Sequence, residues 1–420
     1  MQKALHSYLD IEILDHEVSK IPKKDKRYML YAHVPFCHVF CPYCSFHKYH
    51  YQSDLCKEYF KNLRIEMKRV KEAGYTFSSL YVGGGTPLID EDELIKTLEL
   101  AKKLFDIDEI SCETDPNHIK PEKLYRFKGL IDRLSVGVQS FDNDILRKIS
   151  RLDKFGDQKE LIRKLSDAVG ILPILSLDLI FNFPFQTKKE LLTDINIAKK
   201  LSSEQITLYP LMHSEITSEN IAKTLGVSQK DNEYEFYKII KNELKEYYPN
   251  NSWSFSKVKT NLTDEYVGSN HEYVGIGSGA FSFLDGKLLI NAFNLNDYNL
   301  RIKNGKSTVM ATCDFKPKER LEYLLLTELF DGVINIKEFN TANDANIKKD
   351  LALELNLLRL VGAVYEKNGE IKTTKFGSYL CLVLMKEFYT GMDKVRAIFK
   401  DNTGLKGRIK VMSEKTRIAI

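Results

Sequence analysis

The stretch Tyr31-Ala-His-Val-Pro-Phe-Cys37-His-Val-Phe-Cys41-Pro-Tyr-Cys44 contains the most informative pattern in this chain. It places three cysteines at the spacing CxxxCxxC on one short loop. Three thiolates arranged in this way can each ligate one iron of a cubane iron–sulfur cluster. Because no fourth cysteine falls in the run, the spacing predicts a 4Fe–4S cluster in which one iron is open to a small molecule.

Zinc binding and disulfide formation are the alternative uses of these thiols. A structural zinc site usually has four ligands in two paired knuckles, and no second CxxC follows, although histidines lie nearby at positions 33, 38, 47 and 50. Disulfides require an oxidising compartment and an even set of cysteines, whereas this chain has seven. We interpret the remaining four as buried apolar residues or free thiols: Cys56, Cys112, Cys313 and Cys381.

Composition limits the classes of function. The chain has 420 residues, 43% of them hydrophobic, which is enough for two or three packed domains. Its 62 basic and 58 acidic residues nearly balance, so nothing indicates nucleic-acid binding. No run of about 18 apolar residues occurs, and the first residues lack a signal-peptide pattern. Reduced thiols predict a cytoplasmic protein, with peripheral contact to the inner membrane face as a further expectation.

Short apolar strands alternate with helices between residues 28 and 211. The periodicity predicts strands at 28–34, 78–82, 109–114, 133–139, 173–181 and 205–211, and helices at 53–73, 91–105, 120–127, 142–149, 157–170 and 188–201. This alternation is typical of a parallel sheet, in which ligands bind at the C-terminal ends of the strands. Candidate site residues fall at those ends: the cysteine loop, the glycines at 83–85, Glu113, Gln139 and Asp178.

The cysteine run and its lead-in resemble the radical S-adenosylmethionine (SAM) superfamily, and more narrowly its HemN-like branch. Three further stretches carry the resemblance: Gly83-Gly-Gly-Thr-Pro87, Arg133-Leu-Ser-Val-Gly-Val-Gln-Ser-Phe141 and Asp178-Leu-Ile-Phe-Asn-Phe-Pro184. In that superfamily the open iron binds SAM, and an electron from the cluster splits SAM into methionine and a 5′-deoxyadenosyl radical. The resemblance implies an α/β fold with a partial (β/α)6 radical SAM barrel and a C-terminal α+β cap domain that is winged-helix-like.

Five segments are expected along the chain. Residues 1–27 are interpreted as an N-terminal extension, 28–214 as the partial barrel, and 215–310 as a barrel extension with connecting elements. Residues 311–400 are expected to form the cap, because helical stretches at 319–329, 336–339 and 347–360 precede a hairpin near 364–367 and 371–374. Residues 401–420 are expected to form a solvated basic tail.

The resemblance also implies the ligand-binding residues. The metal ligands would be Cys37, Cys41 and Cys44, and two SAM molecules would lie side by side. The first SAM would be held by Tyr31, Gly84, Glu113, Gln139, Arg151 and Asp178. The second would contact Tyr43, Gly85, Thr86 and Phe281. Taken singly, each polar residue is equally well explained as an ordinary structural hydrogen-bonding group, and only the motifs favour SAM binding.

Four functions of the HemN-like branch compete. Oxygen-independent coproporphyrinogen III dehydrogenases usually carry a fourth cysteine two residues after the third, where this chain has Phe46. Non-catalytic heme chaperones share Pro-Tyr-Cys-x-Phe, but they usually continue the Asp-Leu-Ile strand with Gly-Leu-Pro-Gly rather than with Asn182-Phe-Pro-Phe185. The third group opens heme anaerobically by methyl transfer. The fourth contains class C methyltransferases that methylate C8 of menaquinone.

Residues 178–184, 208–212, 275–282 and 385–391 most resemble the fourth group. We therefore expect an enzyme, a class C radical SAM methyltransferase that uses two SAM molecules to methylate an sp2 ring carbon, with menaquinone as the first candidate substrate. Tyr209 and His213 are candidate proton acceptors, although each is also explained as a structural residue. An apolar ring pocket is expected from an aromatic and methionine set, for which core packing is the alternative: Phe181, Phe183, Phe185, Tyr209, Met212, Trp253, Phe255 and Phe281.

The expected partners follow from this chemistry. They are an apolar ring substrate, either a quinone or a tetrapyrrole, and a low-potential electron donor such as flavodoxin or ferredoxin. No nucleic-acid partner is expected. Transient membrane contact is expected, because a prenylated quinone partitions into lipid.

Overall fold

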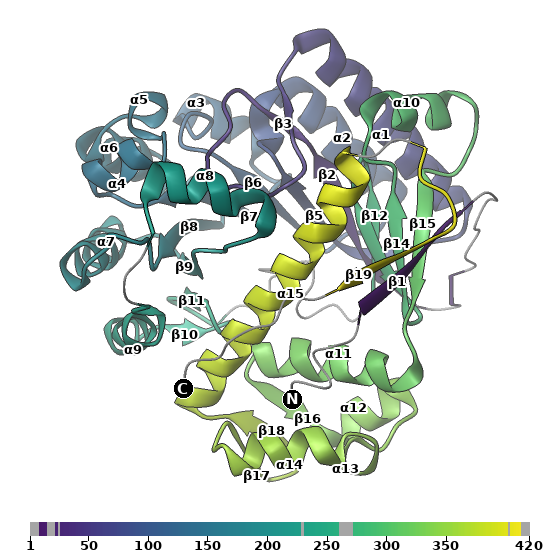
Figure 1. Ribbon diagram of the computed structural model, residues 1–420. Helices are drawn as coiled ribbons and strands as arrows, with labels where there is room; N and C mark the ends of the chain where they lie inside the picture. Colours follow the sequence, from purple (N-terminus) through teal and green to yellow (C-terminus); the bar gives the residue numbers. More distant parts are fainter. Residues whose placement is uncertain are drawn as a thin grey trace.

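The computed structural model describes residues 8–14, 22–23, 26–227, 231–259, 272–401 and 404–412. One fourteen-stranded sheet runs through the main body, and a smaller helical cap with its own three-stranded sheet lies below it (Figure 1). A long helix crosses from the cap to the main body. No helix among the described residues is long and apolar enough to span a bilayer.

Six neighbouring parallel strands form the centre of the sheet. They are β2 (Tyr28–Val34), β5 (Phe77–Gly84), β6 (Glu109–Thr114), β7 (Arg133–Gln139), β8 (Ile174–Phe181) and β9 (Gln205–Pro210). Every residue of β2 is buried, as is typical of a parallel strand covered on both faces. The predicted α/β fold with a partial (β/α)6 barrel is therefore confirmed.

The crossover helices lie close to their expected positions. They are α1 (Ser53–Glu72), α2 (Glu91–Leu104), α4 (Asn143–Lys148), α6 (Gln158–Ala168) and α7 (Lys188–Leu201). Side-chain caps explain some of the starts: Asp90 accepts from the Glu93 backbone, and Thr187 forms a capping box with Glu190. The helix expected at 120–127 is instead α3 (Pro121–Leu124) followed by a 3-10 turn, and a short α5 (Leu152–Phe155) was not expected.

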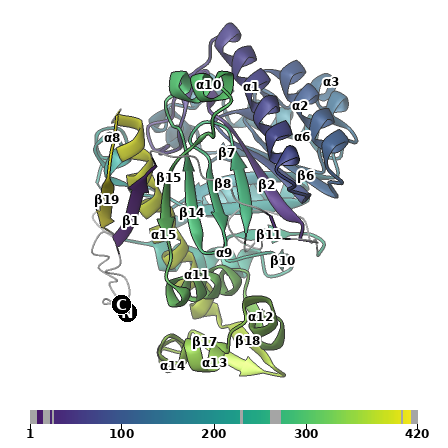
Figure 2. The same ribbon diagram turned by 90° about the vertical axis from the view of Figure 1, so that its right-hand side faces the viewer.

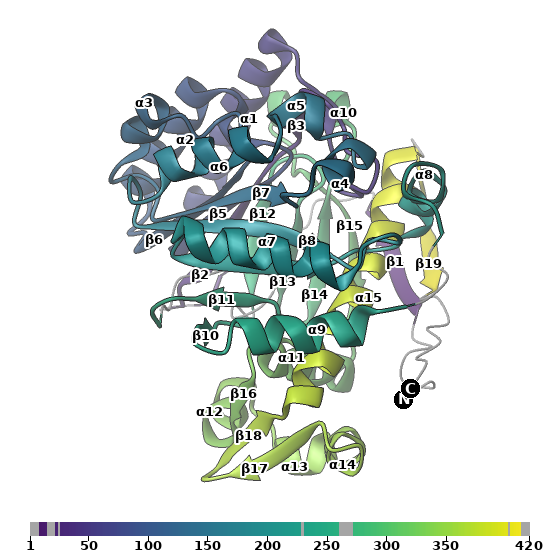
Figure 3. The same cartoon turned by 90° about the vertical axis from the view of Figure 1, so that its left-hand side faces the viewer.

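The sheet continues on both sides of the parallel strands. Next to β2 lies another parallel strand, β12 (Tyr273–Ile276), followed by the antiparallel strands β13 (Phe281–Leu284), β14 (Lys287–Asn291) and β15 (Val309–Asp314) (Figure 2). On the far side β9 pairs with β11 (Ser254–Ser256), which pairs with β10 (Tyr248–Pro249). Helices α7 and α9 (Glu233–Glu243) cover the outer face there (Figure 3). The remaining helices of this region are α8 (Glu215–Leu225) and α10 (Leu295–Lys303).

The two ends of the chain meet at one edge of the large sheet. Strand β1 (Tyr8–Ile13) pairs with β15 and with β19 (Arg408–Met412). Residues 408–412 of the expected basic tail form a strand in which Arg408 and Lys410 are exposed, while 402–403 and 413–420 lie outside the described residues. The strand pair forms because Ile11 is buried against the core and Arg408 pairs with Asp10 at 3.1 Å and Glu12 at 3.0 Å.

The cap contains α11 (Pro317–Phe330), α12 (Ile336–Asn343), α13 (Ile347–Asp350) and α14 (Ala352–Leu360). Its sheet has the order β16 (Val333–Asn335), β18 (Glu370–Thr373), β17 (Val364–Lys367), so the expected hairpin is present. The helix expected at 347–360 breaks at Leu351. Helix α15 (Lys375–Asp401), 27 residues long, was not expected, although its polar and apolar residues follow a helical period.

Asp194 on α7 holds the segment that follows β7. Its carboxylate accepts from the Phe141 backbone at 2.7 Å and from the Ser140 hydroxyl at 2.8 Å. The side chain is almost completely buried, and burial raises its pKa to about 7, although both hydrogen bonds oppose the shift. The folded protein therefore binds this proton more tightly than the unfolded chain does.

This pKa predicts a pH dependence of stability. Stability contributed by the Asp194 proton is present at low pH and is lost as the pH rises from about 4 to about 7. The Asp194→Asn substitution removes this titratable carboxyl group. Between pH 5 and 7, the free energy of unfolding of the unaltered protein should therefore fall relative to that of the variant, by about 1 kcal/mol or more. Denaturant unfolding of both proteins at each pH measures this difference, and parallel pH profiles would contradict the assignment.

Candidate active site

A cavity of about 240 Å³ lies at the C-terminal ends of the parallel strands. All three motif cysteines line it. So do all the expected SAM-binding residues except Phe281: Tyr31, Tyr43, Gly84, Gly85, Thr86, Glu113, Gln139, Arg151 and Asp178. Residues that the sequence spreads over five strand ends and loops are therefore brought into one site.

The cysteine loop would concentrate negative charge if all three of its thiols were ionised. Burial raises the pKa of the Cys37 thiol to about 11, and Cys44 nearby adds to the rise. Burial also acts to raise the pKa of Cys41, but the charges of Arg151 and Lys154 outweigh it and lower that pKa below its ordinary value. Arg151 Nη1 lies 3.4 Å from Cys41 Sγ. Three thiolates can coexist here when metal ions compensate their charge, as they do in an iron–sulfur cluster.

A site for a single metal ion is the alternative use of the three cysteines. A zinc ion draws its ligand atoms to within about 2.0–2.3 Å of one point. Among the described residues, no three His, Cys, Asp or Glu side chains converge in this manner. The cysteines instead share the wall of one cavity, which suits a cluster that presents its irons at separate corners.

The glycine run at the end of β5 packs against the start of the cysteine loop. A Cβ atom on Gly85 would lie 2.5 Å from the carbonyl oxygen of Phe36, so only glycine permits this approach. The backbone of Thr86 donates to that same carbonyl at 2.8 Å. Gly84 has a φ of +122° and donates to Glu113 Oε2 at 3.0 Å. The run therefore fixes the cysteine loop and the Glu113 carboxylate relative to each other.

Tyr31 is fixed by a histidine behind it. Its hydroxyl lies 2.8 Å from His33 Nδ1, and His33 Nε2 lies 3.0 Å from the carbonyl oxygen of His47. Because a carbonyl only accepts, Nε2 carries the proton and Nδ1 accepts from Tyr31. Burial lowers the pKa of His33 to about 4, so the ring is neutral at pH 7.

The ends of β7 and β8 supply further polar groups. Gln139 has a φ of +75°, a strained conformation for a non-glycine residue of the kind that gathers at functional sites. Asp178 accepts from the Ser135 and Ser176 hydroxyls, and burial raises its pKa to about 6. Arg151 donates to the Gly137 carbonyl. These groups are held by the sheet before any ligand binds.

Two buried polar atoms at this end of the cavity have no partner within the described part of the chain: Thr114 Oγ1 and Arg151 Nε. Buried polar groups are ordinarily hydrogen-bonded, so these two atoms can take a partner from a bound ligand or from ordered water. The residues therefore fit a polar, charged cofactor bound beside an iron–sulfur cluster.

Helix α15 contributes residues that the sequence analysis missed. Tyr389, Asp393 and Arg396 line the cavity, and Arg396 Nη1 donates to Asp393 Oδ1. The guanidinium lies over the rings of Phe46 and Phe281, 5.4 and 5.7 Å from their centroids. A sequence signal was present, because these three polar residues recur at i, i+4 and i+7 within an apolar helix.

The two candidate proton acceptors lie in different places relative to the cavity. Tyr209 lines the cavity, and its ring centroid lies 5.2 Å from that of Trp253, whereas His213 is exposed and outside the lining. Of the expected aromatic and methionine pocket, Tyr209, Met212 and Trp253 line the cavity. The expectation was wrong for the others, which do not line it: Phe181, Phe183 and Phe255 are buried in the core, as is Phe281 behind Arg396, and Phe185 lies under Lys148.

Comparison with known proteins gives consistent matches. Residues 31–198 match the Radical SAM superfamily. Over 286 residues the chain is 32% identical to the heme chaperone HemW of Bacillus subtilis, a match covering 64% of this chain and 74% of that protein. Over 215 residues it is 32% identical to the oxygen-independent coproporphyrinogen III oxidase of Helicobacter pylori, covering 48% of this chain and 47% of that protein. The structure of HemN, the coproporphyrinogen III oxidase of Escherichia coli, superposes with a TM-score of 0.72 at 20% identity, over 87% of this chain and 91% of that one, so the fold is shared.

The fold and the three-cysteine site define a radical SAM protein, and the cofactors of that superfamily are a 4Fe–4S cluster and SAM. Within the superfamily, the chain belongs to the HemN/HemW-like family. The names of these relatives concern heme and coproporphyrinogen. They give no support to the finer resemblance to menaquinone methyltransferases, and the binding of a second SAM stays a prediction.

The cluster ligands can be tested by iron content. Anaerobically reconstituted protein should bind about four irons and show a cubane absorption spectrum. Cys37→Ala, Cys41→Ala and Cys44→Ala should each abolish that spectrum, because a cluster with three protein ligands cannot spare one. Cys313→Ala, which changes a buried cysteine outside the cavity, is the matched control and should retain it. A full cluster in the triple cysteine variant would refute the assignment.

Proposed function

We propose that this protein is a radical SAM methyltransferase that methylates an sp2 carbon of a flat, uncharged ring, with C8 of menaquinone as the first candidate. The observation that carries the proposal is the division of the cavity lining into two ends. One end is polar and contains the cysteines with Glu113, Gln139, Arg151 and Asp178. The other is largely aromatic and apolar and contains Tyr209, Leu211, Met212, Trp253 and Tyr389.

The polar end suits SAM, which supplies the methyl group and, with an electron from the cluster, the radical chemistry. Arg151 offers a charged fork to the methionyl carboxylate, and Glu113 offers a carboxylate to the ammonium group. Asp178 and Gln139 suit the ribose hydroxyls, and the ring of Tyr43 suits the adenine. A second SAM would contact Tyr43, Gly85 and Thr86.

The charges of the lining favour an uncharged ring over one that bears propionates. Each cation of the described lining already has an acceptor. Arg151 donates to Cys41, Lys154 to the Val39 carbonyl, Lys48 to the Cys44 carbonyl, and Arg396 to Asp393. Lys48, Lys154 and Arg396 therefore do not require a ligand carboxylate as their partner, and a quinone ring leaves these contacts as they are. Helix α15 contributes Tyr389 to this end of the lining.

A tetrapyrrole is the second candidate ligand, and the names of the relatives favour it. The heme chaperone of Bacillus subtilis is 32% identical to this chain, and the coproporphyrinogen oxidases share its fold. Under this alternative the protein would bind heme as a chaperone, oxidise coproporphyrinogen, or open heme by methyl transfer. The aromatic end would then contact the tetrapyrrole face.

The partners follow from the proposed reaction. Reduction of the cluster requires a low-potential donor, for which flavodoxin and ferredoxin are the candidates. A prenylated quinone lies in the membrane, so the protein must contact the bilayer transiently to reach it.

A product assay separates the enzyme from a binding protein. With a strong reductant, SAM and menaquinone lacking the C8 methyl group, the reconstituted protein should release 5′-deoxyadenosine and S-adenosylhomocysteine together with methylated menaquinone. The Cys41→Ala protein should release none of these. Tight heme binding without methyl transfer to any quinone or porphyrin would instead identify the protein as a heme chaperone.

A gene deletion tests the substrate in the cell. The deletion strain should lose methylated menaquinone and retain unmethylated menaquinone, as measured by mass spectrometry of the lipid extract. Complementation with the Cys41→Ala gene should not restore the methylated form. An unchanged quinone profile combined with a requirement for heme would instead favour the porphyrinogen enzyme.

A further inference from the structure

Two buried polar atoms of residues that line the cavity have no hydrogen-bond partner within the described ranges. They are Nε1 of Trp253 and Oδ2 of Asp393. Both residues line the cavity, and each is only 1% exposed. A buried polar atom without a partner is costly, and proteins contain few of them. One of these atoms can only donate and the other, in an ionised carboxylate, can only accept.

The position of Asp393 is fixed by its neighbour one turn later. Arg396 donates to Oδ1, and the same guanidinium lies over Phe46 of the cysteine loop and Phe281 of β13. This contact compensates the carboxylate charge and orients the side chain. Oδ2 is consequently left as an acceptor held in place without a donor.

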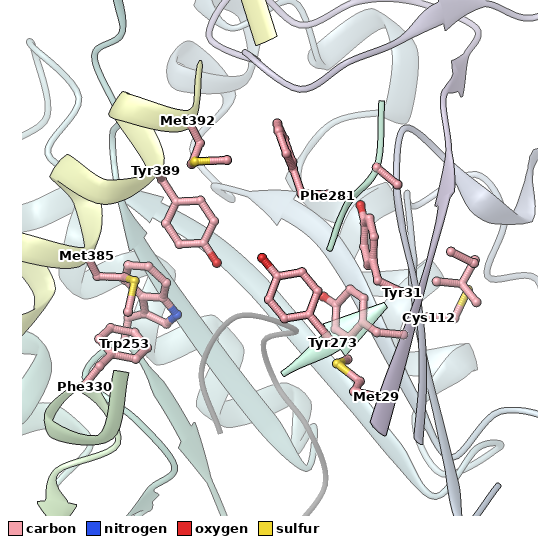
Figure 4. Packing of buried hydrophobic residues seen from close by; sticks show 14 of the residues in the cluster. Met29, Tyr31, Cys112, Trp253, Tyr273, Phe281, Phe330, Met385, Tyr389 and Met392 are labelled. Atoms are coloured by element: carbon pink, nitrogen blue, oxygen red, sulfur yellow. The ribbon is translucent and has the colours of Figure 1, made fainter. Parts of the chain in front are cut away.

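The position of Trp253 is fixed by three neighbouring aromatic rings. Its ring centroid lies 4.5 Å from that of Phe330, 5.2 Å from Tyr209 and 6.0 Å from Tyr389. In Figure 4 its indole nitrogen lies on the side of the ring that faces the hydroxyl of Tyr389. The indole therefore offers a preoriented donor within a largely apolar surface.

We infer that this end of the cavity recognises a flat ring that carries both an acceptor for Trp253 and an O–H or N–H donor for Asp393, and that the substrate is therefore the reduced hydroquinone. The inference rests on the proposed function. An oxidised quinone has acceptors only, so its carbonyl oxygen would face the Asp393 carboxylate without a shared proton. The pyrrole N–H groups of a metal-free tetrapyrrole offer the same donor chemistry, whereas the nitrogens of heme are occupied by iron.

Calorimetric titration under anaerobic conditions tests the inference without turnover. The probes are menadione and its hydroquinone menadiol, added to reconstituted protein with an oxidised cluster and no SAM. Menadiol should bind about tenfold more tightly or better, because menadione leaves a buried charged acceptor unpaired. Equal affinities, or tighter binding of menadione, would overturn the inference.

Two variants assign the effect to the two atoms. Asp393→Asn supplies an amide that can donate as well as accept, so the preference for menadiol should disappear. Trp253→Phe removes the indole N–H and should weaken both compounds severalfold while leaving the preference intact. Glu235→Gln, an acid-to-amide change on the exposed face of α9, is the matched control and should behave as the unaltered protein. Retention of the full preference in Asp393→Asn with intact iron content, or unchanged affinities in Trp253→Phe, would refute the assignment.

Parallel titrations with heme and protoporphyrin IX separate this inference from the proposed function. Binding of menadiol in preference to all three other compounds supports both. Tight binding of heme with no binding of either naphthalene compound overturns the proposed function and the inference with it. Methyl transfer accompanied by equal binding of menadiol and menadione overturns the inference alone.

Discussion

The contact between the backbones of Phe36 and Gly85 is the constraint on which the site depends. The carbonyl of Phe36 accepts from Thr86, the backbone of Gly85 donates to Val34 at 2.8 Å, and no Cβ fits between the two segments. This contact holds the first turn of the cysteine loop against the end of β5. Glu113 is tied to the same glycine run through Gly84. The cysteine loop and the Glu113 carboxylate are therefore positioned by the same glycine run, and a shift of that run would move both.

Helix α15 closes the site from the opposite side. It starts in the cap, where it packs against α11, and it ends beside the cysteine loop through Arg396 and Phe46. A single helix thus couples the position of the cap to the shape of the aromatic end of the cavity.

Much of the barrel could be predicted because its signals are local. Strands such as β6 and β7 match their expected ranges, since each is a short apolar run bounded by turn residues. The clustering of Cys37, Glu113 and Asp178 also followed from sequence, because the C-terminal ends of parallel strands meet at one edge. The approach of Arg396 to Phe46 could not be predicted, because it depends on the docking of a helix some 350 residues after the cysteine loop. Strand β19 was not predicted for the same reason, because its partner, β1, lies at the opposite end of the chain.

The order of the elements along the chain has a consequence for assembly during synthesis. All six parallel strands and the cysteine loop precede residue 211, whereas α15 follows residue 374. The barrel sheet can form while the ribosome is still adding the cap. During that interval Tyr389, Asp393 and Arg396 are not yet present, so the part of the cavity wall that α15 supplies is completed only late in synthesis.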